Sequence, residues 1–325
     1  MTTPQHKIGS GFGARSTADD VLQGIDLSGK LAIVTGGYSG LGLETTRALA
    51  RAGARVVVPA RRREVAEEAV GGVGGVEVDE LDLADLQSVR RFAERFLATG
   101  RSVEIVINNA GVMACPETRV GPGWEAQFAT NHLGHFALVN RLWPAIARGR
   151  GRVVSVSSAG HRHAGIRWDD VQFERGYDKW QAYGQAKTAN VLFAVQLDAL
   201  GRDAGVRAFA LHPGGILTPL QRHLAKEEMV EAGWIDEDGN ALNPEFKTPE
   251  QGAATQVWAA TSPQLAGMGG VYCEDCDIAE PTTGAGVGPG VRDYAIDPEQ
   301  AARLWALSAE LTGVNAFPAV AGSSR

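Results

Sequence analysis

The chain has few of the features that mark secreted, membrane-bound or nucleic-acid-binding proteins. It carries only three cysteines, which is typical of a reducing compartment. Two of them, Cys273 and Cys276, form a C-x-x-C pair, but no second pair or H-x-x-x-H accompanies it, so we expect no metal site. No apolar run is long enough for a signal peptide or a membrane anchor. The net charge is −7, and no basic stretch carries interleaved aromatic residues, which argues against nucleic acid as a partner. These absences predict a cytoplasmic protein that has no nucleic acid as partner.

Short apolar runs alternate with longer helix-like segments along most of the chain. This is the pattern of a parallel sheet wrapped by helices, so we expect an α/β fold with a doubly wound sheet of about seven parallel strands. The predicted strands are 31–35, 54–59, 76–81, 103–108, 152–157, 206–211 and 269–273. The predicted helices are 41–51, 64–70, 86–98, 124–147, 183–200 and 298–311, with a short one within 16–22.

The expected organisation is a single domain with additions at both ends. Residues 1–29 form an N-terminal extension, 30–278 the α/β domain, and 279–325 a C-terminal loop, helix and tail. Within the domain, the polar and mixed segment around 217–247 is expected to form a small substrate-binding lobe. A chain of this length suggests two domains by size alone, but large α/β folds often use it as one.

A glycine-rich turn joins the first predicted strand to the first predicted helix and reads T-G-G-Y-S-G-L-G over residues 35–42. Glycines here permit a tight turn and let the backbone approach a pyrophosphate, which the helix N-terminus favours electrostatically. A plain strand–helix connection is the alternative, but the position within the first βαβ unit favours a dinucleotide site. The contacts expected from this turn are Gly36, Tyr38, Ser39, Gly40, Leu41 and Gly42.

The end of the second predicted strand bears on the choice of dinucleotide. A site for NAD usually has an acid here, whereas NADP needs a positive group for its 2′-phosphate. The chain reads P-A-R-R-R over residues 59–63, with no acid before Glu64. Three arginines at a helix start also oppose the helix dipole, although they could be a solvated surface. We predict NADP(H) as the preferred cofactor, with Arg61 at the phosphate and NAD(H) as the alternative.

Tyr183 and Lys187 are four residues apart on a predicted helix and so share one face. Reduction of a carbonyl by hydride needs a proton donor at the oxygen. Free tyrosine, with a pKa of about 10, is a poor acid–base group at neutral pH. A lysine ammonium close by favours phenolate and is expected to bring the pKa toward the working range. The alternative is an exposed Tyr–Lys pair without function.

Together these motifs resemble the short-chain dehydrogenase/reductase family. Its T-G-x-x-x-G-x-G matches residues 35–42, its N-N-A-G residues 108–111, its Y-x-x-x-K residues 183–187 and its P-G residues 213–214, all in the family's order. The resemblance implies a Rossmann-type fold and direct hydride transfer between nicotinamide C4 and a carbonyl carbon. In this reaction Tyr183 would move the proton, and Lys187 would also hold the nicotinamide ribose.

The resemblance assigns further site residues. Ser158, with Ser157 as a second candidate, would donate to the substrate oxygen, and the backbone of Asn131 would position a water between the lysine and solvent. The alternative for Asn131 is a helix residue bonded to backbone. His132 and His135 lie in the same helix and are interpreted as packing or surface residues rather than ligands. The remaining cofactor contacts implied are Asp82, Leu83, Asn109, Ala110, Gly111, Pro213, Gly214, Ile216 and Thr218.

The long spacing between Ser158 and Tyr183 resembles a subgroup that contains retinol dehydrogenases and the oxidoreductase domain of WW-domain-containing members. So do N-H-L-G-H-F at 131–136, V-L-Q-G at 21–24 and L-W at 304–305. Aromatic side chains in 159–181 and 217–247 could wall an apolar pocket or simply pack these segments onto the domain. A moderately large hydrophobic aldehyde, ketone or secondary alcohol is the expected substrate.

The residues leave other functions open. A dinucleotide-binding sensor without turnover typically loses the tyrosine or the lysine, and both are present here. An epimerase or dehydratase of the extended branch favours T-G-x-x-G-x-x-G, but Ser39 stands at its second glycine. A reductase of C=C or C=N bonds fits the same residues. Family members also form homo-dimers or homo-tetramers through the long helices after the fourth and fifth strands, so either assembly is an expectation.

Overall fold

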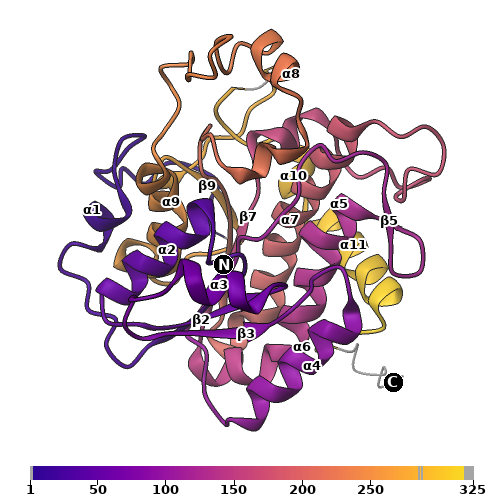
Figure 1. Ribbon diagram of the computed structural model, residues 1–325. Coiled ribbons are helices and arrows are strands. Elements are labelled where there is room, and N and C mark those ends of the chain that lie inside the picture. The colour runs from indigo at the N-terminus through magenta and orange to yellow at the C-terminus, as the bar shows by residue number, and fades with distance from the viewer. Residues whose placement is uncertain (1–2, 285, 287, 318–325) are drawn as a thin grey trace.

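An eight-stranded sheet runs through the middle of the computed structural model, which describes residues 3–284, 286 and 288–317 (Figure 1). The strand order is β3-β2-β1-β4-β7-β8-β9-β10; all neighbours pair in parallel except β9 and β10. The α/β prediction is confirmed, and the strand it missed is the two-residue β10. The strands are β1 (Leu31–Val34), β2 (Arg55–Ala60), β3 (Val76–Glu80), β4 (Ile105–Asn108), β7 (Arg152–Val156), β8 (Arg207–His212), β9 (Val271–Glu274) and β10 (Asp277–Ile278).

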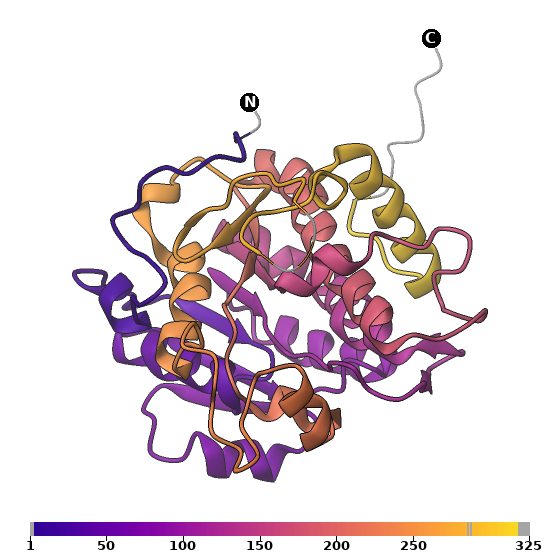
Figure 2. The same ribbon diagram turned by 90° about the horizontal axis from the view of Figure 1, so that it is seen from above.

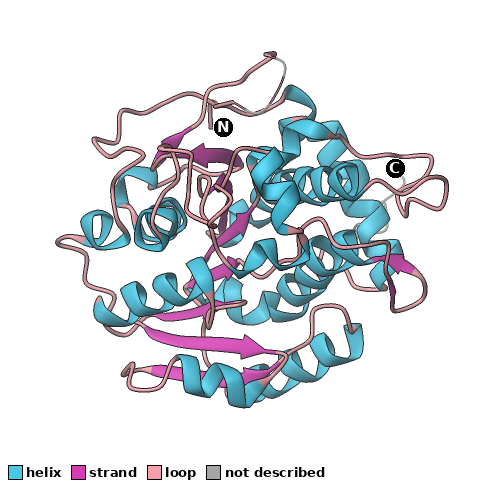
Figure 3. Ribbon diagram, turned by 45° about the horizontal axis from the view of Figure 1, so that its top comes forward, coloured by secondary structure: helices cyan, strands magenta, loops and turns pink. Residues whose placement is uncertain are grey.

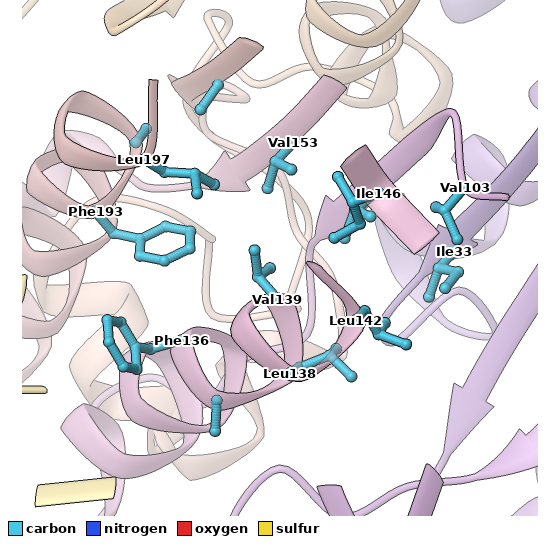
Figure 4. Packing of buried hydrophobic residues seen from close by; sticks show 14 of the residues in the cluster. Ile33, Val103, Phe136, Leu138, Val139, Leu142, Ile146, Val153, Phe193 and Leu197 are labelled. Atoms are coloured by element: carbon cyan, nitrogen blue, oxygen red, sulfur yellow. The ribbon is translucent and has the colours of Figure 1, made fainter. Parts of the chain in front are cut away.

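The central strands are buried on both faces, which is why they read as continuous apolar runs. Successive side chains point to opposite faces, so Ile33 joins the apolar cluster on one side of the sheet and Val34 the cluster on the other. In Figure 4, Phe136, Val139 and Ile146 pack with Phe193 and Leu197 against the first of these faces.

Helices cover both faces of the sheet (Figure 2). One layer contains α1 (Ala18–Leu22), α2 (Gly40–Arg51) and α9 (Pro249–Thr261). The other contains α4 (Leu86–Ala98), α6 (Gly134–Gly149), α7 (Lys179–Gly201) and α11 (Pro298–Thr312), and α3 (Arg63–Ala69) follows β2. Among the described residues, no helix is long and apolar enough to cross a membrane.

The continuous helix predicted over 124–147 is wrong at its start. Trp124–Glu125 forms β6, which pairs with β5 (Arg119–Val120) in a hairpin outside the main sheet (Figure 3). There follow α5 (Ala126–Phe128), a π-helix (Ala129–Leu133) and then α6. The Glu125 carboxylate accepts bonds from the amides of Gln127 and Phe128 at 2.9 and 2.6 Å, and so begins the helix after the hairpin. The π-turn widens the helix locally, and a 3.6-residue periodicity gives no sign of it.

The predicted start of the helix containing Tyr183 is also wrong, because α7 begins at Lys179. Its N-cap is Asp178, whose carboxylate accepts from the amides of Trp180 and Gln181 at 3.0 and 2.7 Å. Tyr183 therefore lies in the second turn, where the helix is already regular.

The segments outside the predicted domain core pack onto it. In the N-terminal extension, the Gln5 side chain donates to the carbonyls of Tyr272 and Ala279 at the β9–β10 edge. Residues 217–247 form a lobe that contains α8 (Lys226–Glu231), seen in orange at the top of Figure 1. At the C-terminal side, α10 (Asp293–Ile296) leads into α11. Positions 1–2, 285, 287 and 318–325 of the predicted end segments lie outside the described residues.

Candidate active site

The predicted site residues lie on loops that follow β1, β2, β3, β4, β7 and β8, at the start of α2, on α7 and, for Asn131, in the π-helix Ala129–Leu133. Because these strands are parallel, their carboxyl ends meet at one edge of the sheet, where ligands of open α/β folds bind. The structure therefore brings the four sequence motifs, which are dispersed over residues 35–214, to a common edge.

The glycine loop after β1 is shaped for a close backbone approach. Gly36 has a φ of +65°. A Cβ at Gly42 would lie 2.2 Å from the Gly36 carbonyl oxygen and 2.5 Å from Asn109 Nδ2, so no larger residue fits there. α2 begins at Gly40, and Ser39 makes no side-chain bond to its first turn. The first amides of α2 are thus available to an anion, and the residues present fit a dinucleotide pyrophosphate.

The loop after β4 is fastened directly to the end of β1. Asn109 Nδ2 donates to the Thr35 carbonyl at 2.9 Å, and the amides of Asn109 and Ala110 both donate to Thr35 Oγ1 at 3.0 Å. These bonds set the N-N-A-G loop beside the glycine loop. A Cβ at Gly111 would lie 3.1 Å from Asn131 Oδ1, which shows how closely the two residues approach.

Three predicted cofactor contacts follow β2 and β3. Arg61 comes directly after β2, and its side chain is exposed. Asp82 lies after β3, where its carboxylate accepts from the Ala84 amide at 2.9 Å, and Leu83 beside it is buried. Arg61 is thus exposed at the carboxyl end of β2, whereas the Asp82 carboxylate has a local partner.

The loop after β8 faces the glycine loop from the other side. A Cβ at Gly40 would lie 3.4 Å from Thr218 Cβ, and Ile216 is buried nearby. Behind Pro213–Gly214 lies the buried Lys247, whose Nζ is paired with Asp275 Oδ1 at 2.6 Å. A Cβ at Gly214 would approach Lys247 Cδ to 2.6 Å, so the glycine leaves room for the lysine stem.

Tyr183, Lys187 and Ser158 meet where β7 ends against α7. The Lys187 ammonium lies 5.6 Å from the centre of the Tyr183 ring and donates to the Val156 carbonyl at 3.0 Å. The Ser158 hydroxyl lies beside the Tyr183 ring, since a Cβ at Gly160 would be 2.8 Å from Tyr183 Cε1 and 3.3 Å from Ser158 Oγ, and it accepts from the Gly160 amide at 3.0 Å. Ser157, the second serine candidate, donates instead to the Lys187 carbonyl at 2.7 Å, which leaves Ser158 as the hydroxyl at the tyrosine.

The expected lowering of the Tyr183 pKa by Lys187 is wrong for the protein alone. Burial raises the Tyr183 pKa to about 12, and the hydrogen bond with Ser158 opposes this only in part. Burial also lowers the pKa of Lys187 to about 8. At neutral pH the tyrosine is therefore a protonated phenol, ready to act as an acid, and most of the lysine is still an ammonium.

Asn131 lies in the π-helix and is held on both sides of its amide. Its Nδ2 donates to the Val112 carbonyl at 2.9 Å and its Oδ1 accepts from the Val112 amide at 2.8 Å. The side chain is thus committed to the loop after β4, while the main-chain carbonyl of Asn131 lies 2.9 Å from His135 Nδ1. His132 and His135 follow Asn131 and are both buried, which confirms packing rather than surface exposure among the two alternatives that the sequence left open.

An apolar cluster covers Tyr183. Its buried members are Met113, Ala114, Tyr183 and Leu224, and Met229 of the lobe packs against them. Trp180 stands edge-on to the Tyr183 ring at 6.4 Å. The remaining partly buried members are Leu220 and Trp234, and the Trp234 ring lies 6.2 Å from that of Trp180. Of the aromatics considered as a pocket wall, Trp180 and Trp234 lie at this site, whereas Trp168 packs against α11 through a bond to Gln300.

Sequence reasoning assigned no site role to Thr35, His135 or Lys247. Thr35 begins the glycine motif and could have been found there, and His135 stands in the N-H-L-G-H-F string that was already singled out. Lys247 carries no motif and lies 33 residues after Gly214, so only the fold places the two together.

The C-x-x-C cysteines are structural. Cys273 lies in β9 and Cys276 in the turn that follows, and both are buried as free thiols. Burial raises the pKa of both thiols, that of Cys276 to about 11, which disfavours the reactive thiolate.

Comparisons with known proteins agree with this geometry. The family model "short chain dehydrogenase" matches residues 30–229. A protein of Streptomyces antibioticus named "Probable oxidoreductase" is 48% identical over 292 residues, covering 86% of this chain and 97% of the relative. Mouse retinol dehydrogenase 12 is 36% identical over 297 residues, covering 89% and 88%. A solved structure from Mycobacterium paratuberculosis matches with a TM-score of 0.71 and 35% identity, covering 93% of this chain and 98% of that one.

The predicted likeness to the subgroup of the retinol dehydrogenases is confirmed by the second of these relatives. Family match, relatives and site geometry lead to one conclusion: the chain belongs to the short-chain dehydrogenase/reductase family and is an NAD(P)-dependent oxidoreductase.

Proposed function

We propose that the chain is an NADPH-preferring reductase that converts apolar ketones or aldehydes to alcohols. The observation that carries this proposal is the protonated, buried Tyr183 between Ser158 and an apolar cluster. A phenol with a raised pKa holds its proton at neutral pH and can deliver it to a carbonyl oxygen as negative charge develops there. The protonated phenol is the form of Tyr183 that carbonyl reduction uses, so reduction is the direction we propose.

Tyr183, Ser158 and Lys187 have different roles in the proposed reaction. When bound, the reduced nicotinamide would supply a hydride to the carbonyl carbon. Tyr183 gives its proton to the oxygen, and the Ser158 hydroxyl donates a hydrogen bond to the same atom. The Lys187 ammonium stabilises the phenolate that remains, since it already faces the ring at 5.6 Å.

The substrate class is proposed from the cluster above the tyrosine. Leu224, Met229 and Trp234 come from the lobe, and Met113 comes from the loop after β4. A carbonyl compound reaching Tyr183 must therefore contact these apolar groups and displace water from them, which favours an aliphatic or aromatic substrate. The preference for NADPH is proposed from the exposed Arg61 after β2 and the absence of an acid there.

The test is NADPH and NADH consumption by the purified protein with aliphatic aldehydes of increasing length, aromatic ketones and a polar keto-sugar. We expect turnover with NADPH that rises with apolar surface. Tyr183→Phe removes the proton donor and should lower kcat/KM at least about 100-fold while leaving NADPH binding intact. Turnover that survives this substitution would contradict the role of Tyr183. Tight NADPH binding without turnover of any carbonyl would favour a sensor instead.

A further inference from the structure

His135 occupies a position that the reaction scheme above does not use. It is the second residue of α6, directly after the π-helix that contains Asn131, and only 2% of its surface is exposed. A buried imidazole needs partners for both ring nitrogens. His135 has two, at 2.9 Å for Nδ1 and 2.8 Å for Nε2, and neither is a water or a surface group.

The two hydrogen-bond partners of His135 show which ring nitrogen carries the proton. Nδ1 contacts the main-chain carbonyl of Asn131, which can only accept, so Nδ1 carries the hydrogen. Burial lowers the pKa of His135 to about 4, so the ring is neutral and Nε2 is an acceptor. Thr35 Oγ1 lies 2.8 Å from Nε2 and 3.3 Å from the Ile107 carbonyl, so the nearer Nε2 is the acceptor to which we assign its hydroxyl proton.

Thr35 links His135 to the glycine loop after β1 and to the N-N-A-G loop after β4. Its oxygen accepts from the amides of Asn109 and Ala110, while its proton goes to His135. One imidazole thus joins the end of β1, the N-N-A-G loop and the π-helix, and both of its ring nitrogens have a hydrogen-bond partner. Such fully satisfied buried networks hold their members in a single arrangement.

The held group is the carbonyl of Asn131. Its side chain is fixed separately by Val112, and the His135 ring is the side chain that contacts the main-chain oxygen. Lys187 lies nearby, because a Cβ at Gly111 would be 3.1 Å from Asn131 Oδ1 and 3.7 Å from Lys187 Nζ. The ammonium is also close enough to act electrostatically on the His135 ring.

We propose that His135 is a positioning residue of the reaction centre, which fixes the Asn131 carbonyl relative to Lys187 and couples it through Thr35 to the dinucleotide loops. The ring touches neither substrate nor cofactor. Its effect on turnover runs through the π-helix, and that effect presupposes the carbonyl reduction proposed above.

His132 provides a matched control three residues earlier. It is equally buried, at 2%, but its Nε2 contacts Ser308 of α11 at 2.7 Å. Its ring packs with Phe128, 5.2 Å away between ring centres, on the side of α11. Loss of either imidazole removes a buried ring and a hydrogen bond, but only loss of His135 releases the Asn131 carbonyl.

The experiment compares His135→Leu and His135→Asn with His132→Leu and His132→Asn, by unfolding midpoint, NADPH affinity, kcat and KM. We expect similar losses of stability at both positions. Only His135→Leu should lower kcat, by about 10- to 100-fold, with KM changed less than about 3-fold, because small displacements at a reaction centre have effects of this size. His135→Asn should recover part of the loss. An asparagine in this helix can donate to the carbonyl four residues earlier, as Asn140 already does to Phe136 at 2.9 Å.

Equal loss of kcat at the two positions, or full kcat in a folded His135→Leu variant, would overturn the proposal. A second measurement does not depend on turnover. Nitrogen NMR of the imidazoles should show His135 as the neutral Nδ1–H tautomer at pH 6, and Thr35→Val should perturb its Nε2 signal. A charged ring or the Nε2–H tautomer would refute the assignment. Absence of turnover in the unaltered protein, with the Nδ1–H tautomer intact, would instead count against the proposed reduction.

Discussion

Two regions of this molecule show opposite relations between sequence and structure. Around the ends of β1 and β4, short motifs set local backbone geometry: Gly36 has a positive φ, and Gly42 leaves no room for a Cβ. In the C-terminal cover, residues 298–317, the sequence predicted a helix and offered L-W at 304–305, but it did not show the contacts with distant residues that build the cover. The comparison shows which structural features can be predicted from sequence. A feature that depends on the backbone conformation of a few neighbouring residues can be predicted, whereas a feature that depends on packing between distant residues cannot.

The C-terminal cover lies on α6 and α7 (Figure 1). Trp305 stacks on Phe193 at 5.7 Å and meets Phe136 edge-on at 4.8 Å. The chain then continues so that the Ala316 amide donates to Asn140 Oδ1 at 2.9 Å. The long helices of the expected homo-dimer or homo-tetramer are thus partly covered by the same chain, and an assembly through them would have to include α11. The assembly itself stays a prediction.

Trp305→Ala should have the largest effect on stability and sharpens the comparison most. Removal of a buried tryptophan from a packed aromatic cluster costs about 3–5 kcal/mol of unfolding free energy. Chemical denaturation measures this loss, with Leu242→Ala as control, since Leu242 is 55% exposed. We expect the folded fraction to bind NADPH as before, because the dinucleotide loops lie elsewhere. NADPH affinity that falls together with stability would show that the two regions are not separable.

Arg61→Ala tests the motif-rich region, with an intermediate effect on activity and none on stability. A charge-assisted contact to a 2′-phosphate is worth about 10- to 100-fold in kcat/KM. The kcat/KM for NADPH should therefore fall by this factor, and that for NADH should not change. Arg63→Ala is the matched control within the same basic run, because its guanidinium is engaged by Glu67 at 2.7 Å. Equal losses of kcat/KM with both cofactors, or a preference of the unaltered protein for NADH, would contradict a contact between Arg61 and the 2′-phosphate.

The same contrast explains which predictions from sequence succeeded. The order of strands and helices followed from apolar periodicity, and the residues of the glycine loop followed from their spacing. The π-helix around Asn131 was missed because its side-chain pattern is helical throughout, while the extra residue per turn is a property of the backbone. The pairing of His135 with Thr35 joins positions 100 residues apart, and no local propensity encodes such a contact.

The lobe formed by residues 217–247 belongs to neither of the two regions, and substitution of its ion pair should have the smallest effect on stability and on KM. Lys179 at the start of α7 forms an ion pair with Glu228 of α8, and both side chains are partly exposed. Such pairs contribute at most about 1 kcal/mol to stability, so Lys179→Met should hardly change the unfolding midpoint, and KM for a bulky apolar substrate should change by no more than about 2-fold.

Trp234→Ala on the same lobe removes the edge-on contact with Trp180. It should raise that KM by more than Lys179→Met does, because apolar packing rather than charge holds the lobe over Tyr183. Steady-state kinetics at low and high salt separates the two causes. A strong salt dependence, or a larger effect of Lys179→Met than of Trp234→Ala, would mean that the ion pair closes the site.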